Sequence, residues 1–486
     1  MGWKEAAEPV LTRMPAVRRP EGHVPFKRKL MWTAGILMLY FFLTNVTLFG
    51  LQSGGANDLF GQFRAILAGS QGSVLQVGIG PIVTASIVLQ LLGGANLLGL
   101  DTDDPRDQVL YQGLQKVLVV LMVILTGLPM VFAGGFLPAQ SSLQLGGLAL
   151  GQTQVQLLIF AQIFIGGVLI LYMDEVVSKW GVGSGIGLFI IAGVSQRLVT
   201  GFIQPAAGGF FFDWYRILTG QVEVGSIISG EGLQALLINQ GHIIALLTTL
   251  LIFGIVVYAE SVRVEIPLSH ARVKGARGRF PVKLIYASVL PMILVRAVQA
   301  NVQFMGQILN RQLASMPSWL GVYSQGQPTG GLFYYLAPIY SPRDWMWWTA
   351  NVAQEWWQVM IRIGIDVTFM VVGGAIFAIF WVETTDMGPE STAKQIQNSG
   401  MQIPGFRQNV GVIEKVMERY IPQVTVIGGA LVGLLAVWAN MLGTIGNVSG
   451  TGLLLAVSIT YKLYEEIAEE QLMEMHPMMR QMFGNE

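Results

Sequence analysis

The sequence predicts an all-α membrane protein that crosses the bilayer ten times. Of its 486 residues, 52% are hydrophobic and only 12% are charged, whereas soluble domains carry about 25% charged residues. The mean hydropathy is +0.55. Apolar runs of about 20 residues, the length at which a helix crosses a bilayer, recur along the chain. We expect the spans at residues 30–50, 74–93, 114–137, 155–173, 184–205, 243–259, 284–309, 359–382, 421–442 and 450–467.

Positive charges predict how these spans are oriented. Cytoplasmic loops of membrane proteins are enriched in Lys and Arg. Most of the 29 Lys and Arg residues of this chain fall in segments that the ten spans place on one side of the bilayer. We therefore expect both ends of the chain in the cytoplasm, with residues 1–29 before the first span and residues 468–486 after the last.

The order of the spans predicts two halves, residues 30–205 and 243–467, joined by the external hinge segment 206–242. Each half holds five spans, and an odd number gives the halves opposite orientations, as in inverted repeats. Prolines interrupt corresponding spans, at Pro81 in the second and Pro291 in the seventh. The working site of such a protein lies at the interface of its halves.

The second span and the segment before it predict a pathway through the membrane. Residues 54–69 are amphipathic and too short to span, and Gly78, Gly80 and Pro81 interrupt the apolar run that follows. Glycine and proline weaken or kink a helix, and irregular backbone at membrane depth lines a cavity rather than facing lipid. We expect a half-helix that enters the membrane and turns back.

Composition and motif spacing exclude several kinds of chemistry. The chain has no cysteine, and its four histidines lack metal-ligand spacing, so we expect neither a metal nor a cofactor. The glycine-rich run 181–187 departs from the dinucleotide fingerprint at Ile186, and no Lys-Ser or Lys-Thr pair follows. Close helix packing and a flexible end to a pore-lining helix both remain open for this run. A membrane-embedded enzyme is disfavoured because no nucleophile constellation is present.

Charged residues within the spans bear on a second hypothesis, a secondary transporter of small solutes built from inverted repeats. Arg362 and Asp366 lie four residues apart, share a helix face and are expected to pair. Arg296 has no local partner, and an aqueous cavity is a candidate environment for it. A transporter needs coupling-ion ligands near the midplane, and the sequence offers none beyond these three residues.

Two long cytoplasmic loops, 260–283 and 383–420, predict an anionic partner. Loop 260–283 carries many more basic than acidic residues. This number of basic residues exceeds what anchoring in the membrane requires. A concentration of positive charge favours RNA or acidic lipid.

Segments along the whole chain resemble the SecY family, in its archaeal and eukaryotic branch. They run in the order of the ten spans. They are G-I-G-P-I-V-T-A at 78–85, D-E-V-V-S-K-W-G-V-G-S-G-I-G-L-F-I at 174–190, I-P-L-S-H-A-R-V-K-G-A at 266–276, F-W-V-E-T-T at 380–385, G-F-R at 405–407 and R-Y-I-P at 419–422.

The resemblance implies a clamshell of two halves around an hourglass pore. Such a pore conducts unfolded secretory polypeptides across the membrane, releases hydrophobic segments sideways into lipid, and performs no chemistry of its own. The ribosome or another partner drives it. At the constriction the family carries a ring of aliphatic side chains, which we call the collar. It maps to Ile79, Val83, Ile186, Ile190, Ile293 and Leu455. Without the resemblance, these would be assigned to a core or a lipid-facing surface.

Three further sites follow from the resemblance. A plug helix at 55–67 blocks the external funnel and maps to Leu59, Phe60, Phe63, Arg64, Ile66 and Leu67. A lateral gate lies between the second and seventh spans, with polar positions at Thr84, Thr126 and Asn301. Ribosome contacts map to Arg272, Lys274, Arg277, Arg279 and Arg407.

The resemblance also implies partners and a location. The partners are a SecE-type subunit, a small third subunit of the beta type, the ribosome, nascent secretory and membrane polypeptides with their signal sequences, and membrane lipid. The expected location is the plasma membrane, in which the protein is multi-pass.

Overall fold

The structure, a computed structural model, places a helix in each of the ten expected spans. It describes residues 8–9, 11–22, 24–52, 67–94, 98–99, 105–132, 137–145, 148–205, 209–221, 231–239, 241–270, 277–283, 290–313, 316–324, 327–349, 354–385, 387–398, 401–402 and 410–475. The ten helices are α2 (Phe26–Asn45), α4 (Gly80–Gly94), α5 (Pro105–Phe132), α6 (Gln152–Trp180), α7 (Gly185–Ile203), α10 (Ile243–Ser261), α11 (Leu290–Gln312), α13 (Trp356–Thr384), α15 (Val410–Leu442) and α16 (Gly450–Met475).

Six of the described helices are long and apolar enough to cross a membrane. They are the segments Arg106–Phe132, Gln152–Trp180, Gly185–Ile203, Ile243–Ser261, Trp356–Glu383 and Val410–Leu442. The remaining expected spans are shorter or more polar. α4 has 15 residues, and such a helix rises about 22 Å, less than the roughly 30 Å of hydrocarbon in a bilayer. α11 carries a buried arginine and several buried glutamines, which lower its hydropathy.

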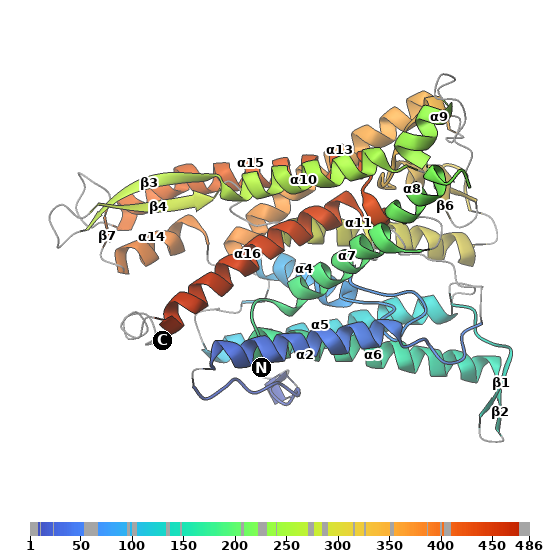
Figure 1. Cartoon of the computed structure of the whole chain (residues 1–486). Coiled ribbons are helices and arrows are strands. Elements are labelled where there is room, and N and C mark those ends of the chain that lie inside the picture. The colour runs from blue at the N-terminus through green and yellow to red at the C-terminus, as the bar shows by residue number, and fades with distance from the viewer. Residues whose placement is uncertain are drawn as a thin grey trace.

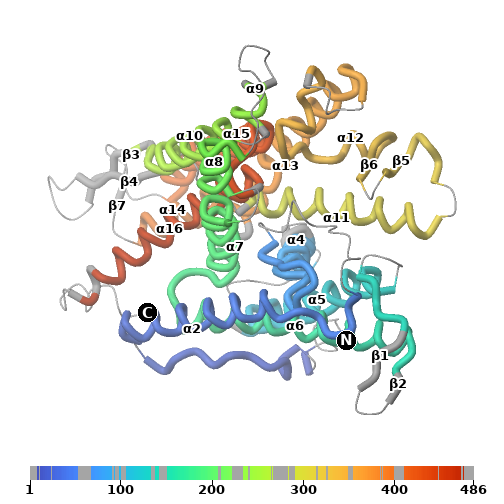
Figure 2. Tube along the Cα trace, turned by 45° about the vertical axis from the view of Figure 1, so that its right-hand side comes forward, coloured from blue at the N-terminus to red at the C-terminus, as the bar shows by residue number. Residues whose placement is uncertain are grey.

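Six of the helices form two outer layers, and four others run between these layers. In Figure 1, α2, α5 and α6 of the first half lie on one side, and α10, α13 and α15 of the second half lie on the other. α4, α7, α11 and α16 run between these layers. Figure 2 shows α4 next to α11, so that here a helix of the first half meets a helix of the second.

Close backbone contact holds the layer of the second half together. α13 crosses α15 at Gly374 and Gly429, where a Cβ on either glycine would lie 2.6 Å from the carbonyl oxygen of the other. Small residues at such crossings let membrane helices pack closely, and dispersion contacts then stabilise the pair. This layer is the surface against which α11 packs.

Short strands and helices form the connections. The strands are β1 (Ser142–Leu145), β2 (Leu148–Gly151), β3 (Arg263–His270), β4 (Arg277–Lys283), β5 (Val322–Ser324), β6 (Gln327–Gly330) and β7 (Met401–Gln402). The short helices are α8 (Phe210–Leu218), α9 (Glu231–Gln234), η2 (Ala235–Asn239), α12 (Leu332–Tyr335), η3 (Pro342–Asp344), η4 (Trp347–Thr349), α14 (Pro389–Asn398) and η5 (Ile445–Asn447). β4, β3 and β7 form one antiparallel sheet in that order.

Candidate functional site: collar, gate and basic sheet

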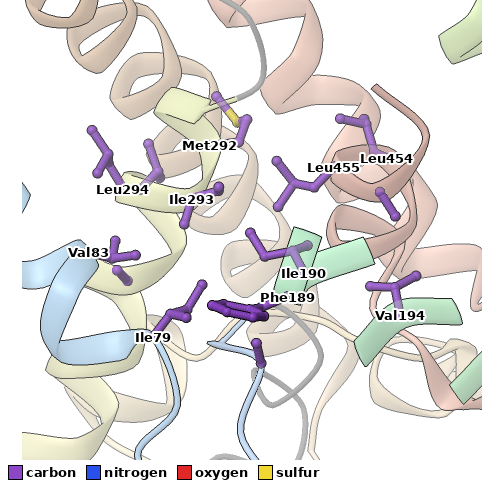
Figure 3. Close-up of a cluster of buried hydrophobic side chains, with 14 of the residues drawn as sticks. Ile79, Val83, Phe189, Ile190, Val194, Met292, Ile293, Leu294, Leu454 and Leu455 are labelled. Carbon is purple, nitrogen blue, oxygen red and sulfur yellow. The ribbon is translucent and has the colours of Figure 1, made fainter. Parts of the chain in front are cut away.

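The aliphatic residues assigned to the collar come together at the centre of the molecule. Ile79, Val83, Ile190, Ile293 and Leu455 are at most 4% exposed and belong to one hydrophobic cluster, against which the partly buried Ile186 packs. Figure 3 shows their side chains converging from α4, α7, α11 and α16, with Ile79 in the segment that leads into α4. Both halves of the chain therefore contribute to one buried apolar cluster.

Phe189 joins this cluster, although the resemblance did not point to it. Its ring is fully buried between Ile79 and Ile190 in Figure 3 and stacks on Tyr40 of α2, with ring centroids 5.0 Å apart. The Tyr40 hydroxyl donates a hydrogen bond to the Ala68 carbonyl at 3.0 Å. An aromatic residue directly before the predicted collar position Ile190 was the available signal in the sequence.

The predicted second span becomes helical only at Gly80. Residues 74–79 instead form turns, and Gly78 has a positive φ of 58°. The Ile79 amide donates to the Leu67 carbonyl at 2.7 Å. Earlier in this stretch the Val74 amide donates to the Val46 carbonyl at 3.0 Å. The break in the helix expected from Gly78, Gly80 and Pro81 is confirmed. Two of its backbone amides are paired with Val46 at the end of α2 and with Leu67, the last residue of the segment assigned to the plug.

Most of the plug assignment lies outside the described residues. Leu59, Phe60, Phe63, Arg64 and Ile66 fall in 53–66, of which nothing structural is described. Leu67 is 8% exposed and belongs to a second hydrophobic cluster with Val77 and Phe304. Beside it, a cavity of about 440 Å³ is lined by Tyr40, Gly69, Ser70, Arg197 and His242, among others.

The glycine-rich run 181–187 is a site of close packing at the start of α7. A Cβ on Gly185 would lie 2.6 Å from the Cα of Asp174, and one on Gly187 would lie 2.9 Å from Ile459. The Asp174 carboxylate of α6 accepts the Ile186 amide hydrogen bond at 2.9 Å. A carboxylate is favourable there because the first amides of a helix lack partners within the helix. Asp174 thereby fixes the end of α7 that carries Ile186 and Ile190.

Two of the three predicted gate residues are in direct contact. The Asn301 side-chain amide of α11 donates to the Thr84 hydroxyl of α4 at 3.3 Å. Thr126 lies on α5, partly buried, and within the described ranges no hydrogen bond joins it to this pair. A single neutral hydrogen bond contributes about 1 kcal/mol, so this polar contact across the halves is weak.

The expected pairing of Arg362 with Asp366 is wrong. Arg362 donates to the carbonyls of Ala337 and Pro338 at 2.9 and 2.8 Å. Asp366 pairs instead with Arg296, at 3.7 Å between Oδ1 and Nη1, and both side chains are 1% exposed. Arg296 is therefore buried and paired, and the aqueous cavity considered as its environment is not what the structure shows.

The two basic loops are joined in the sheet of β4, β3 and β7. β3 and β4 form a hairpin in loop 260–283, and β3 pairs with β7 of loop 383–420. Arg277 and Arg279 lie on β4, opposite Ser269 and Pro267. The other predicted ribosome contacts, Arg272, Lys274 and Arg407, lie outside the described residues.

Glu465 of α16 holds the base of this hairpin. It pairs with Arg263 at the start of β3 at 2.9 Å and also with Lys283 at the end of β4. Further along α16, Glu470 pairs with Lys29 of α2, and Glu474 accepts a hydrogen bond from the Phe26 amide. The end of α16 therefore meets both the sheet and the start of α2.

Comparison with known proteins identifies the family. The family model described as SecY matches residues 73–464, and the one described as the plug domain of Sec61p matches residues 38–72. The protein translocase subunit SecY of Haloarcula marismortui is 73% identical over 489 residues, which cover 100% of both chains.

Solved structures agree over nearly the full length. The one described as "The structure of a protein conducting channel" is 36% identical, with a TM-score of 0.79, and the match covers 97% of this chain and 98% of that chain. The one described as "Sec61 in the Canine ribosome-channel complex from the endoplasmic reticulum" is 35% identical, with a TM-score of 0.76 and the same coverage. The chain is a multi-pass membrane protein that belongs to the SecY family, the protein-conducting channel subunits of the Sec translocon.

Proposed function

We propose that an unfolded polypeptide passes through the collar, which closes around it and seals the membrane when idle. The observation that carries this proposal is the convergence of aliphatic side chains from both halves on one buried cluster. Aliphatic groups offer an ion no ligands, and a narrow apolar constriction excludes water. They also contact any sequence equally well, which suits a channel with many substrates.

Polar substitution of the collar tests this proposal. Ile190→Ser together with Leu455→Ser is expected to raise chloride leak through the idle channel in proteoliposomes severalfold, because hydroxyls favour water in the constriction. Ile190→Leu with Leu455→Ile keeps volume and polarity and is expected to stay sealed. Leu250→Ser on α10 is the lipid-side control, since Leu250 is 61% exposed. Equal leak from the collar and control variants would remove the collar from the pathway.

Hydrophobic segments leave sideways between α4 and α11 in this proposal. Support comes from the contact of these two helices across the halves and from the weakness of the Thr84–Asn301 hydrogen bond that joins them. A hydrophobic segment of the polypeptide can then exchange this interface for lipid. Thr126 on α5 is proposed as a third gate position.

The sheet of β4, β3 and β7 is proposed as the ribosome-docking surface, with Arg272, Lys274, Arg277, Arg279 and Arg407 as contacts to RNA phosphates. Support comes from the pairing of the two basic loops in one sheet and from the likeness to a channel described in a ribosome-channel complex. The ribosome or another partner drives transport. The docking surface then lies in the cytoplasm, and so do both termini, because α2 and α16 meet beside it.

Charge reversal tests the docking surface. Arg277→Glu with Arg407→Glu is expected to weaken ribosome binding severalfold and to lower the slope of log affinity against log salt by about 1 for each phosphate that the variant no longer binds. Arg343→Glu in η3 is the control, because η3 lies against the opposite end of α15 from β7. Unchanged affinity in the double variant at physiological salt would contradict the assignment.

The remaining partners are proposed on the family resemblance. They are a SecE-type subunit, a small beta-type subunit, and the signal sequences of secretory and membrane polypeptides, with the plasma membrane as the location. Large apolar side chains exposed on α2 and α10, such as Met38 and Tyr258, suit lipid or a partner helix.

A further inference from the structure

A buried polar network lies one helical turn from two collar residues. Arg296 of α11 donates through Nε to the Thr451 hydroxyl of α16 at 3.1 Å and through Nη1 to Gln299 at 2.6 Å. Gln299 in turn donates to Asp366 of α13 at 2.9 Å. Asn440 of α15 exchanges hydrogen bonds with Thr451, at 3.2 and 3.3 Å. These five residues, which we call the core network, are at most 3% exposed.

The core network is in register with the collar on two helices. Ile293 precedes Arg296 by three residues on α11, and Leu455 follows Thr451 by four on α16, so each pair shares a helix face. The bond between Arg296 and Thr451 therefore fixes the relative height and rotation of two helices whose next turns carry collar side chains. Hydrogen bonds have narrow distance and angle requirements, which apolar packing alone does not impose.

α11 presents a polar face to its own half and a different face to the gate. Arg296, Gln299 and Gln303 lie at spacings of three and four residues, and Gln303 donates to the Phe333 carbonyl at 3.2 Å. Asn301 comes five residues after Arg296, about 140° around the helix, and contacts Thr84 of α4. α11 is therefore attached to its own half by several charge-assisted bonds and to the other half by one neutral bond.

Energetics argue that stability alone does not explain a buried ion pair here. Desolvation of two charges costs several kcal/mol per ion, and well-packed apolar residues of similar volume often replace such a pair without loss of stability. What apolar replacements do not reproduce is a fixed register, the best-attested contribution of buried polar groups. Because the pair lies beside the collar, a fixed register of α11 and α16 also fixes the positions of Ile293 and Leu455.

We propose that the core network positions Ile293 and Leu455 in the collar and keeps α11 docked to the second half when α4 moves away. Arg296 and Asp366 are then positioning residues for the seal. This inference rests on the proposed role of the collar. The second half then supplies a rigid part of the collar, made of Ile293 and Leu455. The part supplied by the first half, made of Ile79, Val83, Ile186 and Ile190, moves against it when the channel opens and closes.

The test compares stability with leak. Arg296→Met and Asp366→Leu are each expected to lower Tm, because each leaves one buried charge without its partner. The double variant Arg296→Met/Asp366→Leu is expected to recover Tm but to leak chloride severalfold more than the original channel in proteoliposomes. A purely structural role predicts instead that Tm and seal recover together.

Two variants control the comparison. Arg362→Met makes the same change one turn from Asp366, but it removes bonds to the Ala337 and Pro338 carbonyls and none within the core network, so leak is expected to stay low. Thr451→Val removes the acceptor of the Arg296 bond with little change of shape. Thr451→Val is expected to leak more chloride than Arg362→Met. It can replace the double variant in this test if the double variant fails to fold.

The outcomes separate this inference from the collar proposal. If the Ile190→Ser/Leu455→Ser channel leaks while Arg296→Met/Asp366→Leu or Thr451→Val stays sealed, the role of the core network is overturned and the collar is left intact. A sealed Ile190→Ser/Leu455→Ser channel overturns the collar and this inference with it. Leak from Arg296→Met/Asp366→Leu at unchanged Tm supports both.

Discussion

Gly78→Ala is expected to open a leak in the idle channel and to lower its Tm. Gly78 has φ of +58°, and a side chain held in the left-handed region costs about 1–3 kcal/mol. A Cβ at this position would also lie 2.1 Å from the Leu67 carbonyl oxygen. That oxygen accepts the Ile79 amide hydrogen bond, so the substitution forces apart the base of the plug segment and a collar residue.

The matched control is Gly80→Ala, two residues further on. Its nearest neighbour would be Leu67 Cδ2 at 3.6 Å, an ordinary contact, and Gly80 has no positive φ. Alanine at the start of α4 is expected to leave leak unchanged and to raise Tm slightly, because glycine is the poorer helix former. Chloride leak and thermal unfolding measure both effects. Wild-type leak and Tm in Gly78→Ala would show that the Leu67–Ile79 contact does not hold the seal.

The helices could be predicted from local pattern because lipid imposes a length and a composition on each span. The same pattern misplaced the start of the second span at residue 74. The six residues before Gly80 are mostly apolar, yet they form turns whose amides bond to residues 46 and 67, partners that only the folded chain brings near.

The buried charges show where local reasoning fails. Spacing on α13 permits Arg362 to reach Asp366, but carbonyls about 25 residues earlier in the chain bind the guanidinium instead. The acceptors of Arg296 lie on α11, α13 and α16. One signal was available: Arg296, Gln299 and Gln303 form a polar stripe at helical spacing, which predicts a polar partner inside a membrane span.

The charge of the two basic loops could be read from the sequence, but their strands could not. The loops' basic composition, interrupted by Gly and Pro, indicates no strand, and the sheet depends on pairing between β3 and β7, more than 130 residues apart. The collar residues themselves were assigned by family resemblance. Ile79 and Val83, or Ile186 and Ile190, share a face by spacing, but spacing does not distinguish a pore from a core.

Site-specific crosslinking detects whether a polypeptide passes through the collar. The chain has no cysteine, so one introduced cysteine reports one position. When a mild oxidant is added, an arrested secretory polypeptide with a single cysteine at membrane depth is expected to form disulfides with Ile79→Cys, Ile190→Cys and Leu455→Cys, the oxidant taking up the two electrons that each pair of thiols gives up. The lipid-side controls Leu250→Cys and Ile203→Cys, whose native side chains are 61% and 68% exposed, are expected to stay at background.

Release of the polypeptide from the ribosome adds a second comparison within the same experiment. If the polypeptide is released and leaves the channel before the oxidant is added, no collar crosslinks should form, because they report occupancy rather than random collision. We predict strong crosslinks at Ile79→Cys, Ile190→Cys and Leu455→Cys with the arrested polypeptide, and none at these positions when release precedes oxidation. Crosslinks at Leu250→Cys or Ile203→Cys with none at the three collar positions would contradict the account.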